Sequence, residues 1–203
     1  NNNTQLTITQ IIEDPDKATS GRPMFGGGME LKMNEPIYFT TYNRTSKENG
    51  LAMKEIKKKG IKKIVEGPYT FGNFMYSKGG KGKKPVFVYA RGNFEEGNNL
   101  FASYDNFKTQ KQLSDINPQQ RDYNWGTVEL VNWQTADDIF CEGLLFKPED
   151  FDANKKYPVM IYFYEKNAST LYRHRNPTPS RSTINIPYFV SNGYVVFVPD
   201  VYF

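Results

Sequence analysis

Cysteine and histidine are almost absent from this chain of 203 residues, and each occurs once, as Cys141 and His174. A single cysteine cannot form an internal disulfide, and no second cysteine or histidine lies at the spacing of a metal site. This scarcity excludes a disulfide-stapled scaffold and a zinc domain. We expect neither a metal nor a cofactor, and a core held by apolar packing, which a chain of this length can bury.

Long apolar runs are also missing, so we expect no segment of this chain to cross a membrane as a helix. The sequence shows no signal peptide and opens with Asn1-Asn2-Asn3 rather than with Met. We expect a piece cut at both ends. Its compartment therefore stays open, and a periplasmic or secreted location is included if an upstream signal has been removed.

The excess of positive charge is small, because 26 lysines and arginines face 22 acidic residues. Much of it lies in two lysine-rich stretches, 54–63 and 78–84. Such stretches can bind nucleic acid. Both lie beside glycines at turn positions, however, which is typical of solvated hairpin loops. We interpret them as loops and expect no nucleic-acid partner.

Tyrosine and phenylalanine are abundant, and both favour strands. Short runs of aromatic and β-branched residues alternate with polar, glycine-containing turns through the first half of the chain. The expected strands cover 6–12, 36–42, 51–56, 61–65, 73–77, 85–90, 100–104 and 109–113.

The strand pattern repeats. Ile37 and Val86 begin matching strands about 49 residues apart, and Leu51 and Leu100 repeat that offset, as do Lys63 and Lys111 within a residue. A period of roughly 40 to 50 residues with about four strands per unit is typical of β-propeller blades. We count two blades at most, with residues 6–12 as remnant strand material.

The pattern changes near Pro118. Residues 127–134 and 139–146 are joined by a turn at Asp137 and Asp138, which predicts an antiparallel hairpin. Adjacent carboxylates at such a position are typical turn formers, and a calcium site would need more oxygen ligands.

Two later runs, 158–164 and 194–198, are almost wholly apolar, which is typical of strands covered on both faces. Between them, 187–192 predicts a short helix that begins with Pro187 and is capped by Gly193. A helical crossover between two such strands predicts parallel pairing. These features predict the start of an α/β sheet, made of the hairpin and two inner strands.

Five segments now carry a resemblance: Glu129–Trp133, Gly143–Leu145, Lys147–Asp152, Lys155–Val159 and Ser191–Asp200. In order and spacing they resemble the entry to the hydrolase domain in the prolyl oligopeptidase family of serine peptidases, nearest its dipeptidyl peptidase-like branch. The resemblance is specific over about residues 120–203 and weaker over the repeats.

The resemblance implies a mixed β and α/β fold. Residues 1–120 would be C-terminal blades of a β-propeller, and 121–203 would be the first strands of an α/β-hydrolase sheet. It also implies a serine-type peptidase that hydrolyses short peptides through an acyl-enzyme, with oligomerisation left open. No G-x-S-x-G elbow occurs in the sequence, and the nucleophile, acid and base are absent. We expect the chain alone to be inactive.

One site residue follows from the resemblance. In the family, a tyrosine at the end of the strand after a Tyr-Pro pair donates its hydroxyl to the oxyanion hole, and Tyr164 matches that position after Tyr157-Pro158. The family often continues with small residues and glycine, whereas Glu165-Lys166-Asn167 follow here. A purely structural tyrosine is the alternative.

The remaining chemically active side chains have blander interpretations. His174 precedes the place where a nucleophile would come, so we interpret it as a loop residue. Cys141 lies in an alternating strand, where a free cysteine is usually a small buried hydrophobe. The arginines of the loop after Tyr164 could bind a substrate carboxylate or be solvated, and we favour solvation; they are Arg173, Arg175 and Arg181.

Two features stay without a role. Asp200 follows a predicted inner strand, at the end where α/β ligand sites form, and is left unassigned. The glycine run 26–28 lacks the lysine and the strand-then-helix setting of a phosphate-binding loop, so we expect a flexible connection. The competing function is a non-catalytic, propeller-type binding module with a vestigial hydrolase segment.

Overall fold

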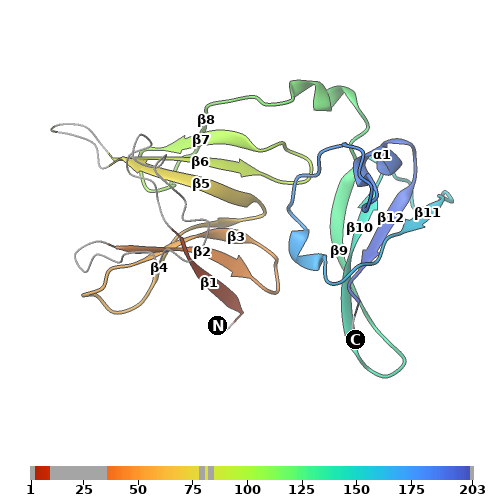
Figure 1. The fold of residues 1–203 in the computed structure, drawn as a ribbon, viewed down its shortest axis with the longest axis horizontal. Coiled ribbons are helices and arrows are strands. Elements are labelled where there is room, and N and C mark those ends of the chain that lie inside the picture. The colour runs from red at the N-terminus through yellow and green to blue at the C-terminus, as the bar shows by residue number, and fades with distance from the viewer. Residues whose placement is uncertain (1–2, 10–35, 78–80, 82–84, 202–203) are drawn as a thin grey trace. The chain divides into compact units, whose positions relative to one another are not determined.

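The computed structural model describes residues 3–9, 36–77, 81 and 85–201 (Figure 1). Over these residues the chain is mostly β, with three four-stranded sheets. It divides into two compact units. Unit 1 is Asn1–Gly92 with Asn98–Asp115, and unit 2 is Asn93–Gly97 with Ile116–Phe203.

The strands of unit 1 are β1 (Thr4–Thr9), β2 (Ile37–Asn43), β3 (Asn49–Lys54), β4 (Lys62–Gly67), β5 (Thr70–Ser77), β6 (Val86–Gly92), β7 (Asn99–Ser103) and β8 (Lys111–Gln112). Unit 2 contains β9 (Thr127–Gln134), β10 (Phe140–Lys147), β11 (Val159–Ile161) and β12 (Val195–Pro199). Its helical segments are the 3-10 turns η1 (Pro118–Asp122) and η2 (Ala168–Thr170) and the helix α1 (Ile186–Ser191).

Unit 1 consists of two antiparallel meanders, β1-β2-β3-β4 and β5-β6-β7-β8, in which each strand pairs with its neighbours in sequence. Four-stranded meanders of this kind are like propeller blades. The strands predicted between residues 36 and 113 are confirmed, with ends shifted by a few residues. The predicted strand 6–12 is described only as far as Thr9, and the glycine run 26–28 and most of the turn 78–84 lie outside the described residues.

The predicted repeat needs one correction, in the strands β3 and β7. Leu51 pairs with Thr40, and the equivalent pair in the next sheet joins Phe101, not Leu100, to Tyr89. The turn before β7 is one residue longer than the turn before β3. A shift of one residue turns a strand side chain to the other face. Leu51 and Phe101 are accordingly buried, whereas Leu100 is 39% exposed.

The strands β4 and β8 confirm the predicted match of Lys63 with Lys111. Lys63 pairs with Ala52, and Lys111 pairs with Ala102 in the equivalent register. The core of unit 1 is rich in aromatic side chains, and its buried aromatic members come from the sheet β5-β6-β7-β8 and the turn before β8. Its buried members are Leu51, Val65, Phe74, Phe87, Tyr89, Phe101 and Phe107.

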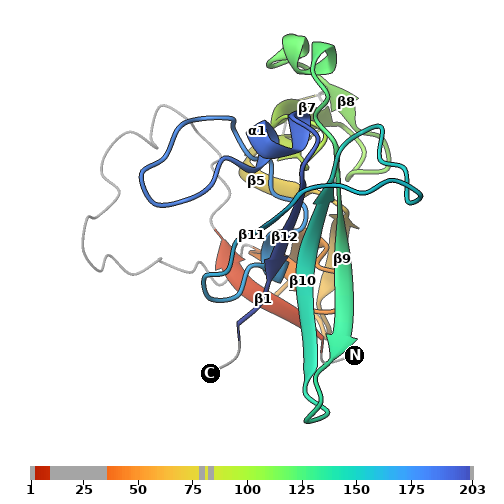
Figure 2. The same cartoon turned by 90° about the vertical axis from the view of Figure 1, so that its right-hand side faces the viewer.

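The sheet of unit 2 has the order β11-β12-β10-β9. The predicted hairpin is confirmed, because β9 and β10 pair antiparallel over their whole length, and their shared turn extends beyond the ends of the other two strands (Figure 2). β10 also pairs antiparallel with β12, and β12 pairs parallel with β11, as the helical crossover predicted. The described sheet contains this one parallel pair, with one short helix between its strands in sequence, so the expected α/β-hydrolase sheet is not shown.

The short helix forms where the sequence predicted it. The side-chain oxygen of Asn185 accepts a hydrogen bond from the backbone N–H of Tyr188, and proline occupies the first turn. Gly193 adopts a φ of 80°, the left-handed conformation that glycine takes without strain, and this ends the helix.

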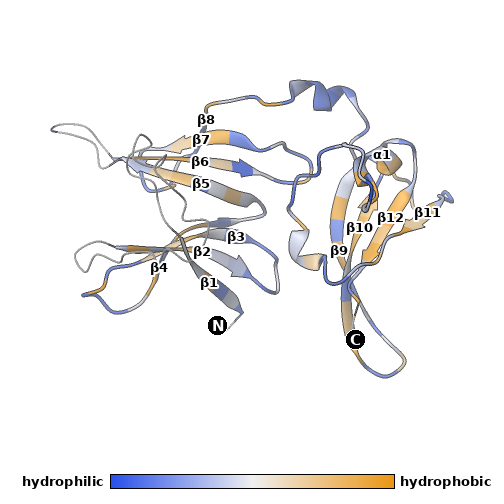
Figure 3. Ribbon diagram, viewed as in Figure 1, coloured by the Kyte–Doolittle hydropathy of each residue, from blue (hydrophilic) through white to orange (hydrophobic). Residues whose placement is uncertain are grey.

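One face of the sheet and α1 enclose the core of unit 2, and β12 is hydrophobic along its length (Figure 3). The buried members of this core are Phe94, Leu144, Phe146, Leu171, Ile186, Val190, Val196 and Val198.

The expectation that residues 158–164 form an inner strand covered on both faces is wrong for the described chain. β11 lies at the sheet edge and is shorter than predicted. Met160 and Tyr162 pack on the core, but Val159, Ile161 and Phe163 are 58%, 57% and 68% exposed. Only one face of β11 is therefore covered.

Candidate functional site

Tyr164 follows β11 in unit 2, at the carboxyl end of a strand paired parallel with β12. Its side chain is 67% exposed. The hydroxyl has no hydrogen-bond partner among the described residues. The phenol is therefore free to donate to a bound molecule.

The backbone after Tyr164 turns sharply. Glu165 has a φ of 53°, in the left-handed region that non-glycine residues rarely adopt. The side-chain amide of Asn167 donates to the carbonyl of Tyr164 at 2.6 Å. The backbone N–H of Val201, just beyond β12, donates to the carbonyl of Glu165 at 3.0 Å. The loop is thus tied both to itself and to the end of β12.

Asp200 makes the strongest of these ties. It is 7% exposed, and its Oδ1 accepts hydrogen bonds from the backbone N–H groups of Asn167 and Ala168, the latter at 2.9 Å. Its own backbone N–H donates to the carbonyl of Glu142 at 2.9 Å. The sequence left Asp200 unassigned. Its position directly after an inner strand was the only signal that it would lie next to the loop after β11.

Arg175 joins the hydrogen-bond network of this loop through Thr170. Its guanidinium donates to Oγ1 of Thr170 at 2.8 Å, and that hydroxyl donates to the carbonyl of Asn167 at 2.8 Å. The guanidinium also lies 5.4 Å from the ring centre of Phe146. Burial, with a smaller contribution from Arg173, lowers the pKa of Arg175 to about 10.

The three loop arginines differ in setting. Arg173 and Arg181 are exposed, as predicted, but Arg175 is half-buried and packs on the core. Among the described residues it has no carboxylate partner. The prediction of a solvated side chain is therefore wrong for Arg175, because the loop folds back over the sheet.

His174 and Trp125 form a stacked pair, with ring centres 5.3 Å apart and planes within 1°. The indole N–H of Trp125 donates to the carbonyl of Phe94 at 2.6 Å. Burial lowers the pKa of His174, opposed by the backbone carbonyls of Asn93 and Phe94. Its Nδ1 is buried and has no hydrogen-bond partner in the part of the chain that the structure describes. This packing favours a structural histidine.

Three other expectations concern single residues. Cys141 is a buried free cysteine on β10, as expected. The N–H of Asp138 bonds to the carbonyl of Thr135 in the hairpin turn, as predicted for a turn former. Over the described ranges, no cluster of three or more histidine, cysteine or acidic side chains could hold a metal ion, and no helix is long and apolar enough to span a membrane.

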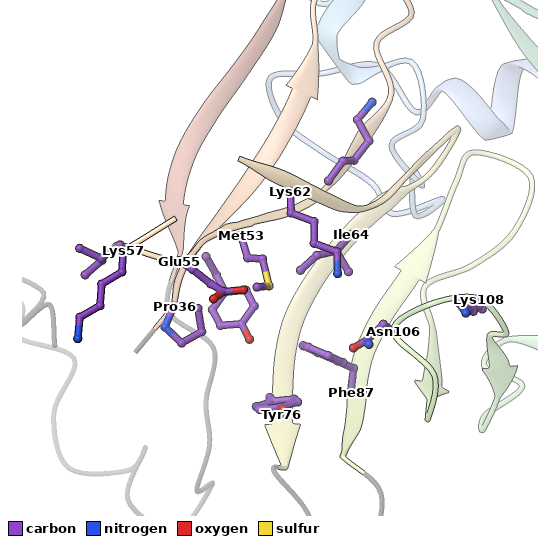
Figure 4. A pocket seen from close by; sticks show the side chains of 13 residues that line it. Pro36, Met53, Glu55, Lys57, Lys62, Ile64, Tyr76, Phe87, Asn106 and Lys108 are labelled. Carbon is purple, nitrogen blue, oxygen red and sulfur yellow. The ribbon is translucent and has the colours of Figure 1, made fainter. Parts of the chain in front are cut away.

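Unit 1 contains a separate cavity of about 740 Å³ (Figure 4). Tyr76 and Phe87 form an aromatic wall. Four lysines line the cavity, namely Lys57, Lys62, Lys63 and Lys108, of which Lys63 is ion-paired with Glu66. The described residues that line it include no serine, cysteine or histidine, so they could bind a ligand but offer no such nucleophile or general base.

Comparison with known proteins gives similarity in structure only. No protein-family model matches the chain, and no curated protein gives a significant match. Among solved structures, AtxE2 isopeptidase with Astexin3-dC4 bound aligns with 81% of this chain at 16% identity and a TM-score of 0.56. The acylaminoacyl peptidase of Pyrococcus horikoshii aligns with 81% at 15% identity and 0.58. Dipeptidyl peptidase 4 of Porphyromonas gingivalis aligns with 98% at 15% identity and 0.56.

The aligned region covers 24%, 23% and 25% of those three proteins, so this chain spans about a quarter of their length. At such low identity the likeness shows the fold alone. That fold consists of blade-like sheets similar to the β-propeller region of prolyl oligopeptidase-type proteins.

Proposed function

We propose that these residues belong to a serine peptidase of the prolyl oligopeptidase type that cleaves short peptides through an acyl-enzyme. In this proposal residues 1–120 supply propeller blades, and residues 121–203 supply the opening strands of an α/β-hydrolase sheet. The serine, aspartate and histidine of the triad lie outside the 203 residues.

The observation that carries the proposal is the setting of Tyr164. The chain that holds two blade-like meanders continues into a sheet with one parallel strand pair. At the carboxyl end of its outer strand lies the exposed phenol of Tyr164, whose hydroxyl no described residue engages. Ligand sites of α/β sheets form at the carboxyl ends of parallel strands. The similar structures of an isopeptidase and two other peptidases support the same class of reaction.

In the proposed reaction a serine attacks the carbonyl carbon of the scissile bond, and negative charge develops on the carbonyl oxygen. Tyr164 donates its hydroxyl hydrogen to this oxyanion. A donor placed in advance stabilises the tetrahedral intermediate, because it needs no reorganisation when the charge appears. The leaving amine departs with a proton from the triad histidine, and water releases the acyl group.

Reaction with a fluorophosphonate probe tests the class of enzyme. The complete gene product that contains these residues should be labelled covalently at one serine, and prior denaturation should abolish labelling. A protein that is folded but resists the probe would count against a serine peptidase.

The role of Tyr164 is tested by Tyr164→Phe in the same protein. Loss of one oxyanion donor typically lowers kcat by about 10²- to 10³-fold, and we expect a fall of that order with a small change in KM. Tyr104→Phe, at an exposed tyrosine of unit 1, is the control and should leave kcat unchanged. Equal rates for Tyr164→Phe and wild type would show a purely structural tyrosine.

The second candidate is a non-catalytic binding module, and the lysine-lined cavity of unit 1 favours it. A cavity with an aromatic wall and several ammonium groups suits an anionic ligand with an apolar body. In that case the probe would fail, and a Lys62→Glu and Lys108→Glu double variant would weaken ligand binding without affecting folding.

A further inference from the structure

The loop that carries Tyr164 is held by bonds within itself and by the end of the neighbouring strand. Asp200 lies just past β12, and its Oδ1 accepts hydrogen bonds from the backbone N–H groups of Asn167 and Ala168. These residues precede it in the chain by 33 and 32 positions. Val201 adds a backbone bond to Glu165 from the same strand end. Three hydrogen bonds therefore join the loop after β11 to the end of β12.

These contacts fill a need that the loop cannot fill alone. η2 begins at Ala168, and the first N–H groups of a helical turn have no partner within the turn. The side chain of Asn167, in the capping position, makes no capping bond, because its amide is turned back to the carbonyl of Tyr164. The buried carboxylate of Asp200 caps the turn instead, and a charged acceptor makes the stronger hydrogen bond.

The cap has a geometric consequence for Tyr164. Because Asp200 caps the turn, the side-chain amide of Asn167 can donate a hydrogen bond to the carbonyl of Tyr164 at 2.6 Å. The strained φ of Glu165 persists only where surrounding contacts enforce it. Without the carboxylate, the turn loses its cap, and the left-handed residue next to Tyr164 keeps only the backbone bond from Val201 to Glu165.

We propose that Asp200 is a positioning residue, which acts through Asn167 and Ala168 to hold Tyr164 where its hydroxyl can meet the developing oxyanion. This inference rests on the proposed function for its catalytic consequence, whereas the clamp itself is a property of the loop. Asp200 touches neither substrate nor reacting atoms in this role.

The clamp is tested first without any activity measurement. Hydrogen exchange of the amides of Asn167 and Ala168 should be slow in the complete gene product and faster in Asp200→Ala by at least tenfold. Asp200→Asn keeps one acceptor oxygen and should give an intermediate rate. Asp137→Ala, at the exposed hairpin turn, is the matched control and should leave both amides unchanged. Unchanged exchange in Asp200→Ala would overturn the clamp.

The positioning role is tested by a double-mutant cycle with Tyr164→Phe. A displacement of about 1 Å can cost about 10²-fold in rate, so Asp200→Asn should lower kcat by about 10- to 100-fold with little change in KM. In the Tyr164→Phe background the same substitution should have almost no further effect, because residues that act through one another are not additive.

The outcomes separate the two proposals. An equal loss of kcat in both backgrounds would overturn the positioning role, since it would show that Asp200 acts independently of Tyr164. Wild-type protein that neither cleaves peptides nor reacts with the fluorophosphonate would overturn the proposed function and the catalytic consequence with it. Even then, amide exchange decides whether Asp200 clamps the loop.

Discussion

Single residues near turns show where sequence is a good guide and where it is not. Gly193 and Pro187 bracket α1 as predicted, because each acts on its own local backbone. Phe107 could not be placed from sequence. It adopts a φ of 64° in the turn before β8, its N–H bonds to Oγ of Ser103, and its ring is buried in the core. That position depends on packing against Phe74, Phe87 and Tyr89 of β5 and β6.

Asp200 and Arg175 are also residues whose positions could not be predicted from sequence. Both are ordinary polar residues in sequence, and both matter only because the loop 164–175 folds over the end of the sheet. The role of Tyr164 was inferred only from family resemblance and stays a prediction. No spacing or composition singles it out among the 14 tyrosines.

The stacked His174 makes stability depend on pH. Burial lowers its pKa in the folded state below the ordinary value of 6.5, so the unfolded chain binds the proton more tightly. The free energy of unfolding of unit 2 should therefore decline as pH falls below about 6.5 and should not depend on this group above that value.

Urea unfolding at several pH values checks this expectation. His174→Phe keeps a ring against Trp125 but cannot be protonated, and His174 is the only histidine in the chain. The variant should lose the decline just below pH 6.5. A wild-type protein whose stability is flat between pH 7 and 5 would contradict the lowered pKa.

At the scale of strands, alternation of apolar and polar residues placed most elements correctly but not their register. The match of Leu51 with Leu100 failed because one extra turn residue changes which face a side chain takes. The repeat period of the sequence does not reveal the length of each turn. The prediction for β11 was wrong for another reason. An apolar sequence does not reveal whether one face or both faces of a strand will be covered.

The corrected register predicts opposite outcomes for two neighbours in β7. Phe101→Ala should destabilise unit 1 by about 3–5 kcal/mol, because it opens a cavity in a packed core. Leu100→Ser should stay within about 0.5 kcal/mol of wild type, because Leu100 points to the exposed face. Denaturant midpoints of the two variants measure the difference. A larger loss from Leu100→Ser than from Phe101→Ala would restore the original register.

For the whole molecule, the repeat period was enough to predict blade-like sheets, because a period reports how many strands follow one another before the pattern returns. Residues 120–203 had no such period, and their assignment to a hydrolase domain rests on the resemblance and stays a proposal. Solved structures at 15–16% identity agree with the fold and leave the chemistry as a proposal. Division of the chain into domains at residues 1–120 and 121–203 is likewise a proposal.

Two separate cores make that division testable in the 203-residue chain. Both tryptophans, Trp125 and Trp133, lie in unit 2, so tryptophan fluorescence reports its unfolding alone, whereas circular dichroism reports both units. Leu144→Ala in the core of unit 2 should lower the fluorescence midpoint, by a loss of about 2–5 kcal/mol. Leu51→Ala should cost a similar amount in unit 1 and leave the fluorescence midpoint in place. If Leu51→Ala shifted the fluorescence transition as far as Leu144→Ala does, the chain would unfold as one cooperative domain, and the boundary near residue 120 would have no energetic meaning.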